Sequence, residues 1–300
     1  MDAWIPVTIA AAAAQTLRFV LQKWLAATGL SATGSTFARF LYSAPLASLL
    51  ALAHARATAQ PLPSIPPAFW AHALAGATAQ ILATICVVAL FAHRNFAVGL
   101  TFKKTEVLMS VPAGLLILGE GVSLPGLLAI LLGLAGVILL SDPPGATGPW
   151  RRRLVNRAAG LGLLSGLCFA ISSVGFRGAA LSLSSGDALG RALVTLASVT
   201  AIQVALMTAW LLWRDRAQIA AVLAAWRVAA LVGLLSLVGS ACSFTALTLQ
   251  TAAYVNALGQ IELVFAVAAS VLVFGERIGR REVQGLAILT LSILLLVLAA

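Results

Sequence analysis

Two lysines and a glutamate stand almost side by side within a long apolar stretch of this 300-residue chain. Residues 100–110 read LTFKKTEVLMS, between the apolar runs VVALF and VPAGLLILG. In a helix, Lys103 and Glu106 share one face, whereas Lys104 points about 100° away. Two interpretations follow. Lys103 and Glu106 form an ion pair that only fixes packing, or one lysine binds an anionic substrate while Glu106 orients it or exchanges a proton.

A second group of polar side chains lies in the segment YVNALGQIE. Asn256 and Gln260 are four residues apart, so a continuous helix would place them on one face. Glu262 follows at once and has no basic residue in its own segment. We therefore expect Glu262 to find a partner on another helix or to remain protonated.

The first apolar segment carries a polar stripe of Gln15, Arg18 and Gln22, at positions i, i+3 and i+7. The stripe either packs against a neighbouring helix or forms the wall of a cavity. In the second case Arg18 could bind a carboxylate or phosphate, because a guanidinium donates two parallel hydrogen bonds. Arg39 lies near the start of the next segment, where anchoring at the membrane interface and a role in gating or binding are both open.

Several other polar groups are expected to have structural roles. Arg177 lies four residues from a loop and could extend its charge to the membrane surface. Glu120 sits in a tight turn and is expected to hold loop or cap contacts. Ser236, Ser240 and Ser243 favour close packing of helices.

The composition indicates which elements must position these groups. The chain is 61% hydrophobic and 9% charged, with a mean hydropathy of +1.03, whereas soluble domains are about 45–50% apolar and about 25% charged. It is therefore an integral membrane protein, and its long apolar segments predict helices. Most of the basic residues lie in short loops, which is ordinary for membrane topology and does not indicate nucleic acid binding of this protein of net charge +10. The three cysteines and three histidines have no metal or redox spacing, so no cofactor or metal is expected.

Ten segments are long enough to cross a bilayer, which requires roughly 20 residues. The breaks between them carry Gly, Pro, Ser or charged residues, as helix ends do. The sequence thus predicts an all-α membrane protein with ten transmembrane helices. The predicted spans are 5–26, 34–54, 68–91, 96–118, 124–141, 158–180, 189–213, 228–250, 252–274 and 283–299.

The two halves of the chain resemble each other. Residues 118–121 read LGEG and residues 274–277 read FGER, and Glu106 and Glu262 are separated by the same 156 residues as the two motif glutamates. Because five spans is an odd number, the second repeat must be inverted, an arrangement used by transporters. We expect a first repeat over 1–141, a cytoplasmic linker over 142–157 and a second repeat over 158–300.

Arginines in the loops predict the orientation. The odd-numbered loops contain eleven arginines and the even-numbered loops only Arg56. The positive-inside rule then places the odd loops in the cytoplasm of a multi-pass inner (plasma) membrane protein, with both termini outside. The N-terminus lacks a basic region, so no cleaved signal peptide is expected.

The sequence resembles a known family at these motifs. SVPAGLLILGEGVSLPGLLAILLGLAGVILL and AVAASVLVFGERIGRREVQGLAILTLSILLLVL are similar to the helix–GE–helix ending of an EamA repeat in the drug/metabolite transporter superfamily. ARFLYSAPLASLL resembles the arginine-containing second helix of such a repeat. The resemblance implies a secondary carrier of small metabolites, not an enzyme. Two features depart from it: Ala268 stands where the first repeat has Pro112, and the family's ten-span members are described with cytoplasmic termini.

The deep charges favour an anionic or zwitterionic substrate, because four cations (Arg18, Lys103, Lys104 and Arg177) outnumber the two anions Glu106 and Glu262. We expect proton-coupled export of a carboxylate- or phosphate-bearing solute, such as an amino acid, by a monomer or weak homodimer in the lipid bilayer. A lipid flippase or a non-transporting scaffold is the alternative. The residues expected to bind substrate are Lys103, Lys104, Arg18, Gln15, Asn256, Gln260 and Arg39. Those expected to couple protons or gate are Glu106 and Glu262.

Overall fold

The computed structural model describes residues 3–27, 30–91, 105–141, 157–275 and 279–299. The regular elements in these ranges are helices, with no strand. Lys103, Lys104 and nearly all of the expected linker lie outside the described residues. The helices are α1 (Trp4–Ala27), α2 (Ala32–Ala57), α3 (Pro67–Phe91), α5 (Glu106–Leu118), α6 (Leu124–Ser141), α8 (Arg157–Ser182), α9 (Ala188–Arg214), α10 (Arg216–Ala224), α11 (Trp226–Leu249), α12 (Ala252–Leu258), α13 (Glu262–Phe274) and α14 (Arg280–Ala299).

Each predicted span contains helix within the described residues. Seven of these helical stretches are long and apolar enough to cross a membrane, namely α1, α2, α3, α8, α9, α11 and the stretch 252–273. The described parts of α5, α6 and α14 form shorter apolar helices. The all-helical membrane class is therefore confirmed, whereas the count of ten crossings stays a prediction.

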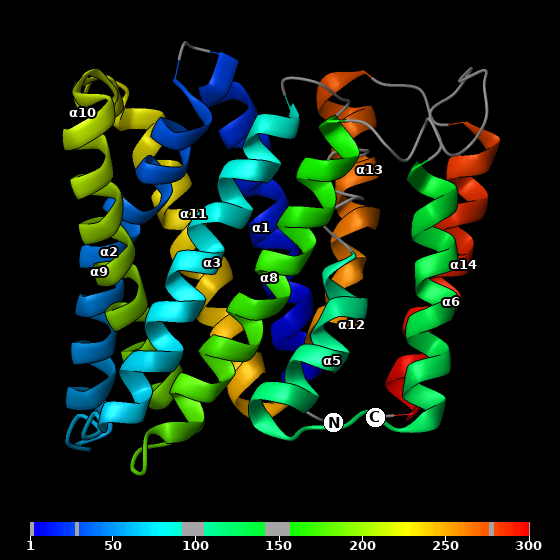
Figure 1. The fold of residues 1–300 in the computed structure, drawn as a ribbon, viewed down its shortest axis with the longest axis horizontal. Helices are drawn as coiled ribbons and strands as arrows, with labels where there is room; N and C mark the ends of the chain where they lie inside the picture. Colours follow the sequence, from blue (N-terminus) through cyan, green and yellow to red (C-terminus); the bar gives the residue numbers. More distant parts are fainter. Residues whose placement is uncertain (1–2, 28–29, 92–104, 142–156, 276–278, 300) are drawn as a thin grey trace.

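Most helices run side by side along one direction, and the two termini lie at the same end of the bundle (Figure 1). We call this the terminus end. The main pairs are α1 with α11, α2 with α9, α3 with α8, and α6 with α14. Each pair joins one half of the chain to the other, so the core is built from both halves.

Glycine allows the closest of these contacts. A side chain at Gly175 of α8 would place its first carbon 2.9 Å from the His72 carbonyl of α3 and 3.1 Å from the Gly76 Cα atom. Small residues let membrane helices approach in this way. Glycine also ends the helices at both GE turns, since Gly119 and Gly275 have φ values of 69° and 65°, in the left-handed region that glycine adopts without steric cost.

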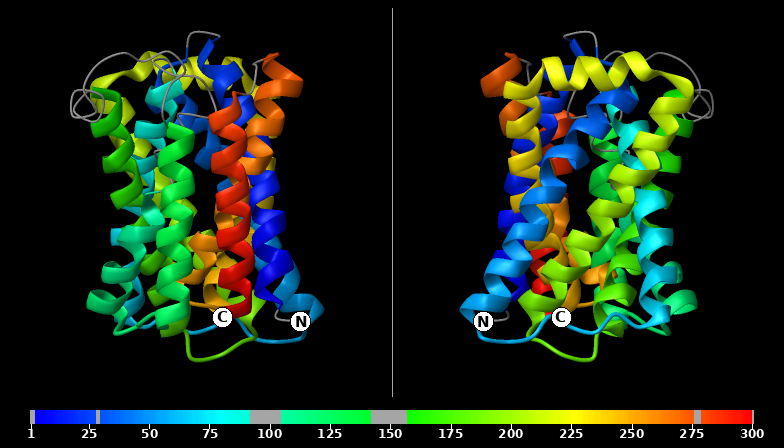
Figure 2. Two further views of the ribbon diagram at one scale, coloured as in Figure 1. Left: turned by 90° about the vertical axis from the view of Figure 1, so that its right-hand side faces the viewer. Right: turned by 90° about the vertical axis from the view of Figure 1, so that its left-hand side faces the viewer.

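The structure corrects two expectations about the helices. The span predicted over 252–274 is interrupted by a 3-10 turn, Gly259–Ile261, which separates α12 from α13. The break predicted between the spans 189–213 and 228–250 contains the nine-residue helix α10. This helix is too short to cross a bilayer. Figure 2 shows α10 lying across the end of the bundle opposite the termini.

Candidate functional site

A cavity of about 80 Å³ lies between helices of the two halves. Its lining combines polar and apolar side chains, and α1, α2, α3, α5, α8, α11, α12 and α13 all contribute. The polar lining residues are Thr8, Gln15, Arg39, Gln80, Glu106, Ser172, Ser173, Ser240, Ser243, Asn256 and Glu262. Polar groups of this number within membrane helices mark a pathway more often than packing.

The two carboxylates related by the 156-residue offset line this one cavity. Glu106 is 6% exposed and Glu262 is 2% exposed, and each is the first residue of its helix, α5 or α13. A helix N-terminus carries partial positive charge and stabilises a nearby carboxylate. The expectation that the two helices bring these groups to a common place is therefore met by the geometry, whereas their role in coupling stays a proposal.

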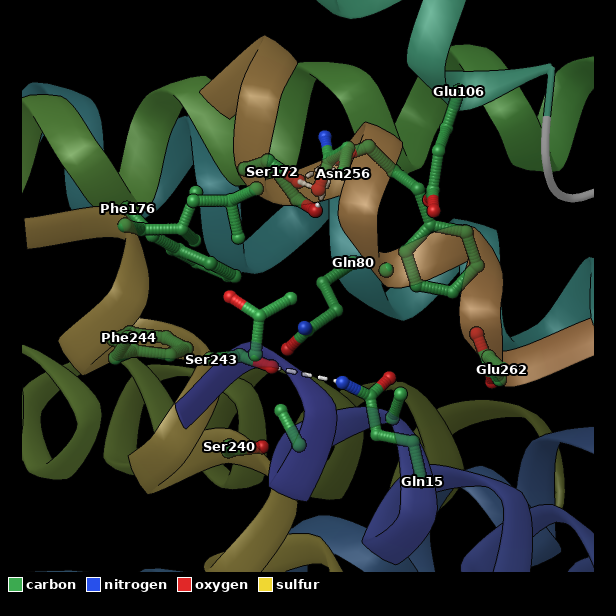
Figure 3. A pocket seen from close by; sticks show the side chains of 18 of the residues that line it. Gln15, Gln80, Glu106, Ser172, Phe176, Ser240, Ser243, Phe244, Asn256 and Glu262 are labelled. Carbon is green, nitrogen blue, oxygen red and sulfur yellow. Dashed lines mark hydrogen bonds between the residues drawn. The ribbon is translucent and has the colours of Figure 1, made fainter. Parts of the chain in front are cut away.

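Amide and hydroxyl groups fill the middle of the cavity (Figure 3). The Gln15 side-chain amide donates to the Ser243 hydroxyl at 2.8 Å, which joins α1 to α11. The Asn256 amide donates to the Ser110 hydroxyl at 2.7 Å, which joins α12 to α5. The Asn256 carbonyl oxygen lies 3.3 Å from the Ser173 hydroxyl of α8. These are uncharged donors and acceptors that can exchange one partner for another at low cost.

Among the described residues, Arg39 is the cation that lines the cavity. Its Nε donates to the Ser236 hydroxyl at 2.9 Å and one terminal nitrogen donates to the Thr84 hydroxyl at 3.0 Å. The residue is only 3% exposed, so of the two roles left open by the sequence, interface anchoring does not fit. Arg39 instead ties α2 to α3 and α11 inside the bundle.

Arg18 lies beside the cavity and not in its lining. It is 1% exposed, donates to the Gln22 side chain, and lies over the Phe19 ring at 3.9 Å. Its Nε and its second terminal nitrogen have no hydrogen-bond partner among the described residues. Glu262 acts electrostatically on both Arg18 and Arg39, so these three groups form one buried charge cluster. The stripe on α1 is thus divided: Gln15 faces the cavity, and Gln22 bonds to the Ser35 carbonyl of α2 at 3.2 Å.

Gln260 departs from the expected geometry. It does not share a cavity face with Asn256, because the 3-10 turn changes the rotation per residue between them. Its side chain packs instead against Gly133 of α6, where an added side-chain carbon would lie 3.1 Å from the Gln260 amide nitrogen.

An aromatic pair lines the end of the cavity nearest the terminus end. The Phe176 and Phe244 rings stack with centroids 4.4 Å apart, and Figure 3 shows them at the opposite end of the cavity from the two carboxylates. Such a pair stabilises by about 0.5–1.5 kcal/mol beyond its buried area.

Arg177, the residue after Phe176, forms an ion pair with Glu120. Arg177 Nε donates to both Glu120 carboxylate oxygens at 2.7 and 2.8 Å, and another nitrogen donates to the Leu247 and Gln250 carbonyls at 2.7 Å each. Arg177 therefore links α8 to the α5–α6 turn and to the α11–α12 turn. The expectation that its charge extends to the membrane surface is wrong for this conformation, whereas Glu120 does hold a turn, as expected.

The sequence did not lead us to predict the uncharged polar side chains of the site. Ser236, Ser240 and Ser243 were interpreted as packing residues, yet Ser236 accepts from Arg39 and Ser243 accepts from Gln15. Their i, i+4, i+7 spacing places them on one face of α11, which was the available signal. Gln80 and Ser172 also line the cavity and were not singled out.

Comparison with known proteins identifies the family. A family model described as the EamA-like transporter family matches residues 156–298. Residues 156–298 belong to the EamA-like transporter family. The expected resemblance is thereby confirmed for the second half of the chain, and members of this family are transporters, not enzymes.

A solved structure shares the fold over nearly the whole chain. One solved structure, described only as a crystal structure of a protein, aligns with a TM-score of 0.65 at 15% identity and covers 97% of this chain and 99% of its own. At this identity the likeness shows a shared fold and nothing more. No curated protein sequence matches the chain.

Proposed function

We propose that this EamA-family protein is a secondary transporter that moves a small organic solute by alternating access. The observation that carries the proposal is the polar cavity, which is lined by helices of both halves and bordered towards the terminus end by the Phe176–Phe244 stack. Membrane carriers hold their substrates near the midplane between two repeats. Glu106 and Glu262 begin their helices within the bundle and not at its ends, which supports such a location.

An inverted repeat of two five-helix units, 1–141 and 158–300, is part of this proposal. The pairing of helices supports it, because exchanging the two halves leaves the pattern unchanged. In terms of the predicted spans, the first packs on the eighth and the sixth on the third, while the second packs on the seventh and the fifth on the tenth. The two GE turns, with their left-handed glycines Gly119 and Gly275, add a local match.

The described lining supports a zwitterionic substrate, such as an amino acid. It offers one guanidinium, Arg39, and two carboxylates, Glu106 and Glu262. The sequence-based count of cations had included Arg177, which the ion pair with Glu120 neutralises. A solute carrying both an amine and a carboxylate can satisfy both signs at once, whereas a phosphate dianion would find one guanidinium and two carboxylates in the lining.

The small volume supports a closed conformation. A cavity of about 80 Å³ has room for two or three waters, each occupying about 30 Å³ in the liquid. An amino acid requires more space, so helices must separate for it to enter. We assign the closed end to the Phe176–Phe244 stack and the Arg177–Glu120 ion pair, which together form the gate at the terminus end. The arginine-rich odd loops support an orientation with that end outside the cell and the other end in the cytoplasm.

Proton coupling is assigned to Glu106 and Glu262. A carboxylate that pairs with a bound amine must release its proton when the substrate arrives, so substrate and proton compete for one group. Export in exchange for protons follows if the gate at the terminus end opens after cytoplasmic loading.

Transport in proteoliposomes tests these assignments. We expect a panel of labelled amino acids to include a substrate whose uptake is driven by an imposed pH gradient. Glu106→Gln and Glu262→Gln should each abolish the response to the gradient, and Glu120→Asp is the matched control at a carboxylate outside the cavity. If both glutamine variants transport at the wild-type rate with the same pH dependence, the coupling assignment is wrong. If no small solute is transported or stabilises the protein, the carrier proposal itself is refuted.

A further inference from the structure

A groove at the end of the bundle opposite the termini has the features of a lipid site and lies outside the transport pathway. It has a volume of about 460 Å³ and lies where α1 ends and α10 meets α11. Its walls are the rings of Trp24 and Trp226, which are 49% and 56% exposed. The remaining lining residues are Leu25, Ala224, Ala225, Arg227 and Val228. Apart from Arg227 the groove offers only apolar and aromatic side chains.

One arginine, Arg227, lines the groove, and the segment around it is basic. Residues 214–228 contain three arginines and a single acidic residue, Asp215. Arg214, Arg216 and Arg227 are all exposed, and the Arg227 guanidinium carbon lies 5.6 Å from the centre of the Trp226 ring. A cation held beside an aromatic wall of an apolar groove matches a lipid that carries a negative head group above its acyl chain.

The position of α10 also fits the membrane interface. This helix lies across the bundle end (Figure 2), and the tryptophans at the end of α9, Trp210 and Trp213, are 50% and 76% exposed. Exposed tryptophans of membrane proteins concentrate at the level of the lipid head groups. The Ser31 backbone amide and hydroxyl both donate to the Gln218 side-chain oxygen, at 2.9 and 3.0 Å, which fixes α10 to the start of α2 and keeps the groove in shape.

We propose that this groove binds an anionic glycerophospholipid, with one acyl chain between Trp24 and Trp226 and the phosphate at Arg227. The proposal goes beyond transport and does not depend on the identity of the solute. A phosphatidylglycerol head group carries a net negative charge, whereas phosphatidylcholine is zwitterionic, so the two lipids separate recognition of the head group from filling of the groove.

The test uses the purified full chain in detergent, titrated with phosphatidylglycerol or phosphatidylcholine of identical acyl chains and followed by native mass spectrometry. We expect tighter binding of phosphatidylglycerol. Arg227→Gln should weaken this binding about fivefold, because a basic residue at a membrane surface contributes roughly a factor of five. Ala225→Phe should weaken the binding of both lipids by filling the groove. Arg56→Gln removes an exposed arginine at the other end of α2 and should change neither.

Three results would overturn the proposal. Equal affinity for the two lipids would show that the head group is not recognised. An equal loss in Arg227→Gln and Arg56→Gln would show general charge attraction without a site. A change of oligomeric state in Ala225→Phe, with no change in lipid affinity, would show that a second copy of the chain covers the groove. Unchanged melting of each variant without lipid confirms that it is folded.

Discussion

Loss of the ion pair behind the aromatic rings should open the cavity towards the terminus end. Arg177 and Glu120 side chains are 11% and 20% exposed, so the pair lies between the surface and buried cases. Surface pairs contribute about 0–1 kcal/mol, and breaking a buried pair costs about 3–5 kcal/mol. We therefore expect Glu120→Gln to destabilise the closed gate by an intermediate value of about 2 kcal/mol. This loss shifts the equilibrium between the closed and open gate by about 30-fold.

Cysteine labelling measures this shift. Ser172 lines the cavity and is only 1% exposed, so a cysteine there reacts with a membrane-impermeant maleimide only when the gate opens. The three native cysteines, Cys86, Cys168 and Cys242, are first replaced by alanine. Reagent is then added on the side of the termini, and Glu120→Gln should speed the labelling of Ser172→Cys about 30-fold.

Two variants control for general loosening of the fold. Glu120→Asp keeps the charge and should label close to the wild-type rate. Arg191→Gln removes an arginine at the start of α9, at the same end of the bundle, that forms no ion pair with Glu120. An unchanged rate in Glu120→Gln, or an equal rise in Arg191→Gln, would refute the assignment of the gate.

The remaining predictions concern the bundle around the cavity. Arg39→Lys replaces the two guanidinium nitrogens that bond Ser236 and Thr84 with one ammonium nitrogen in a different position, and because each bond from a charged group contributes about 1.5–3 kcal/mol, transport in proteoliposomes should fall at least tenfold in a folded variant. Gly175→Leu should lower the melting temperature, since overpacking costs about 1–3 kcal/mol and a carbonyl of α3 lies 2.9 Å from the added carbon; an unchanged melt would mean that α3 and α8 can separate freely. A hydrogen bond from His54, at 3.0 Å, lowers the pKa of the Asp187 carboxyl, so the stability from this pair is present at neutral pH and is lost as pH falls below about 4. Wild-type protein should therefore lose more melting temperature than Asp187→Asn between about pH 6 and about pH 3, and parallel curves would contradict this.

Most of the helices could be predicted because length and hydropathy define a membrane span directly. The two exceptions have local causes. The break in the ninth span depends on Gly259 leaving the α-helical pattern within an apolar stretch, which hydropathy does not register. The helix α10 is short and mixed in polarity, so by composition it resembles a loop.

The site could be predicted only for groups that are costly in a membrane. Glu106, Glu262 and Arg39 were found because a buried charge demands an explanation. Ser172 gives no such signal, because its hydroxyl can bond to the carbonyl of Phe169 in its own helix, as it does at 2.9 Å. The partnership of Arg177 with Glu120 joins residues 57 positions apart, and no periodicity within one helix can reveal it.

The two helices of the interrupted ninth span, α12 and α13, form hydrogen bonds with different neighbouring segments. Before the 3-10 turn, the Tyr254 hydroxyl lies 2.8 Å from the Ser123 hydroxyl and the Asn256 amide donates to Ser110. These bonds connect α12 to α5 and to the α5–α6 turn. Above the turn, the Glu262 carbonyl accepts from Thr16 of α1, so α13 moves with α1. We expect a rotation of one group of helices against the other to bend the chain at the three-residue 3-10 turn, Gly259–Ile261. Glu262 and Asn256 lie on opposite sides of that turn, so in the proposed transport cycle the distance between this carboxylate and this amide should change as the helices rotate.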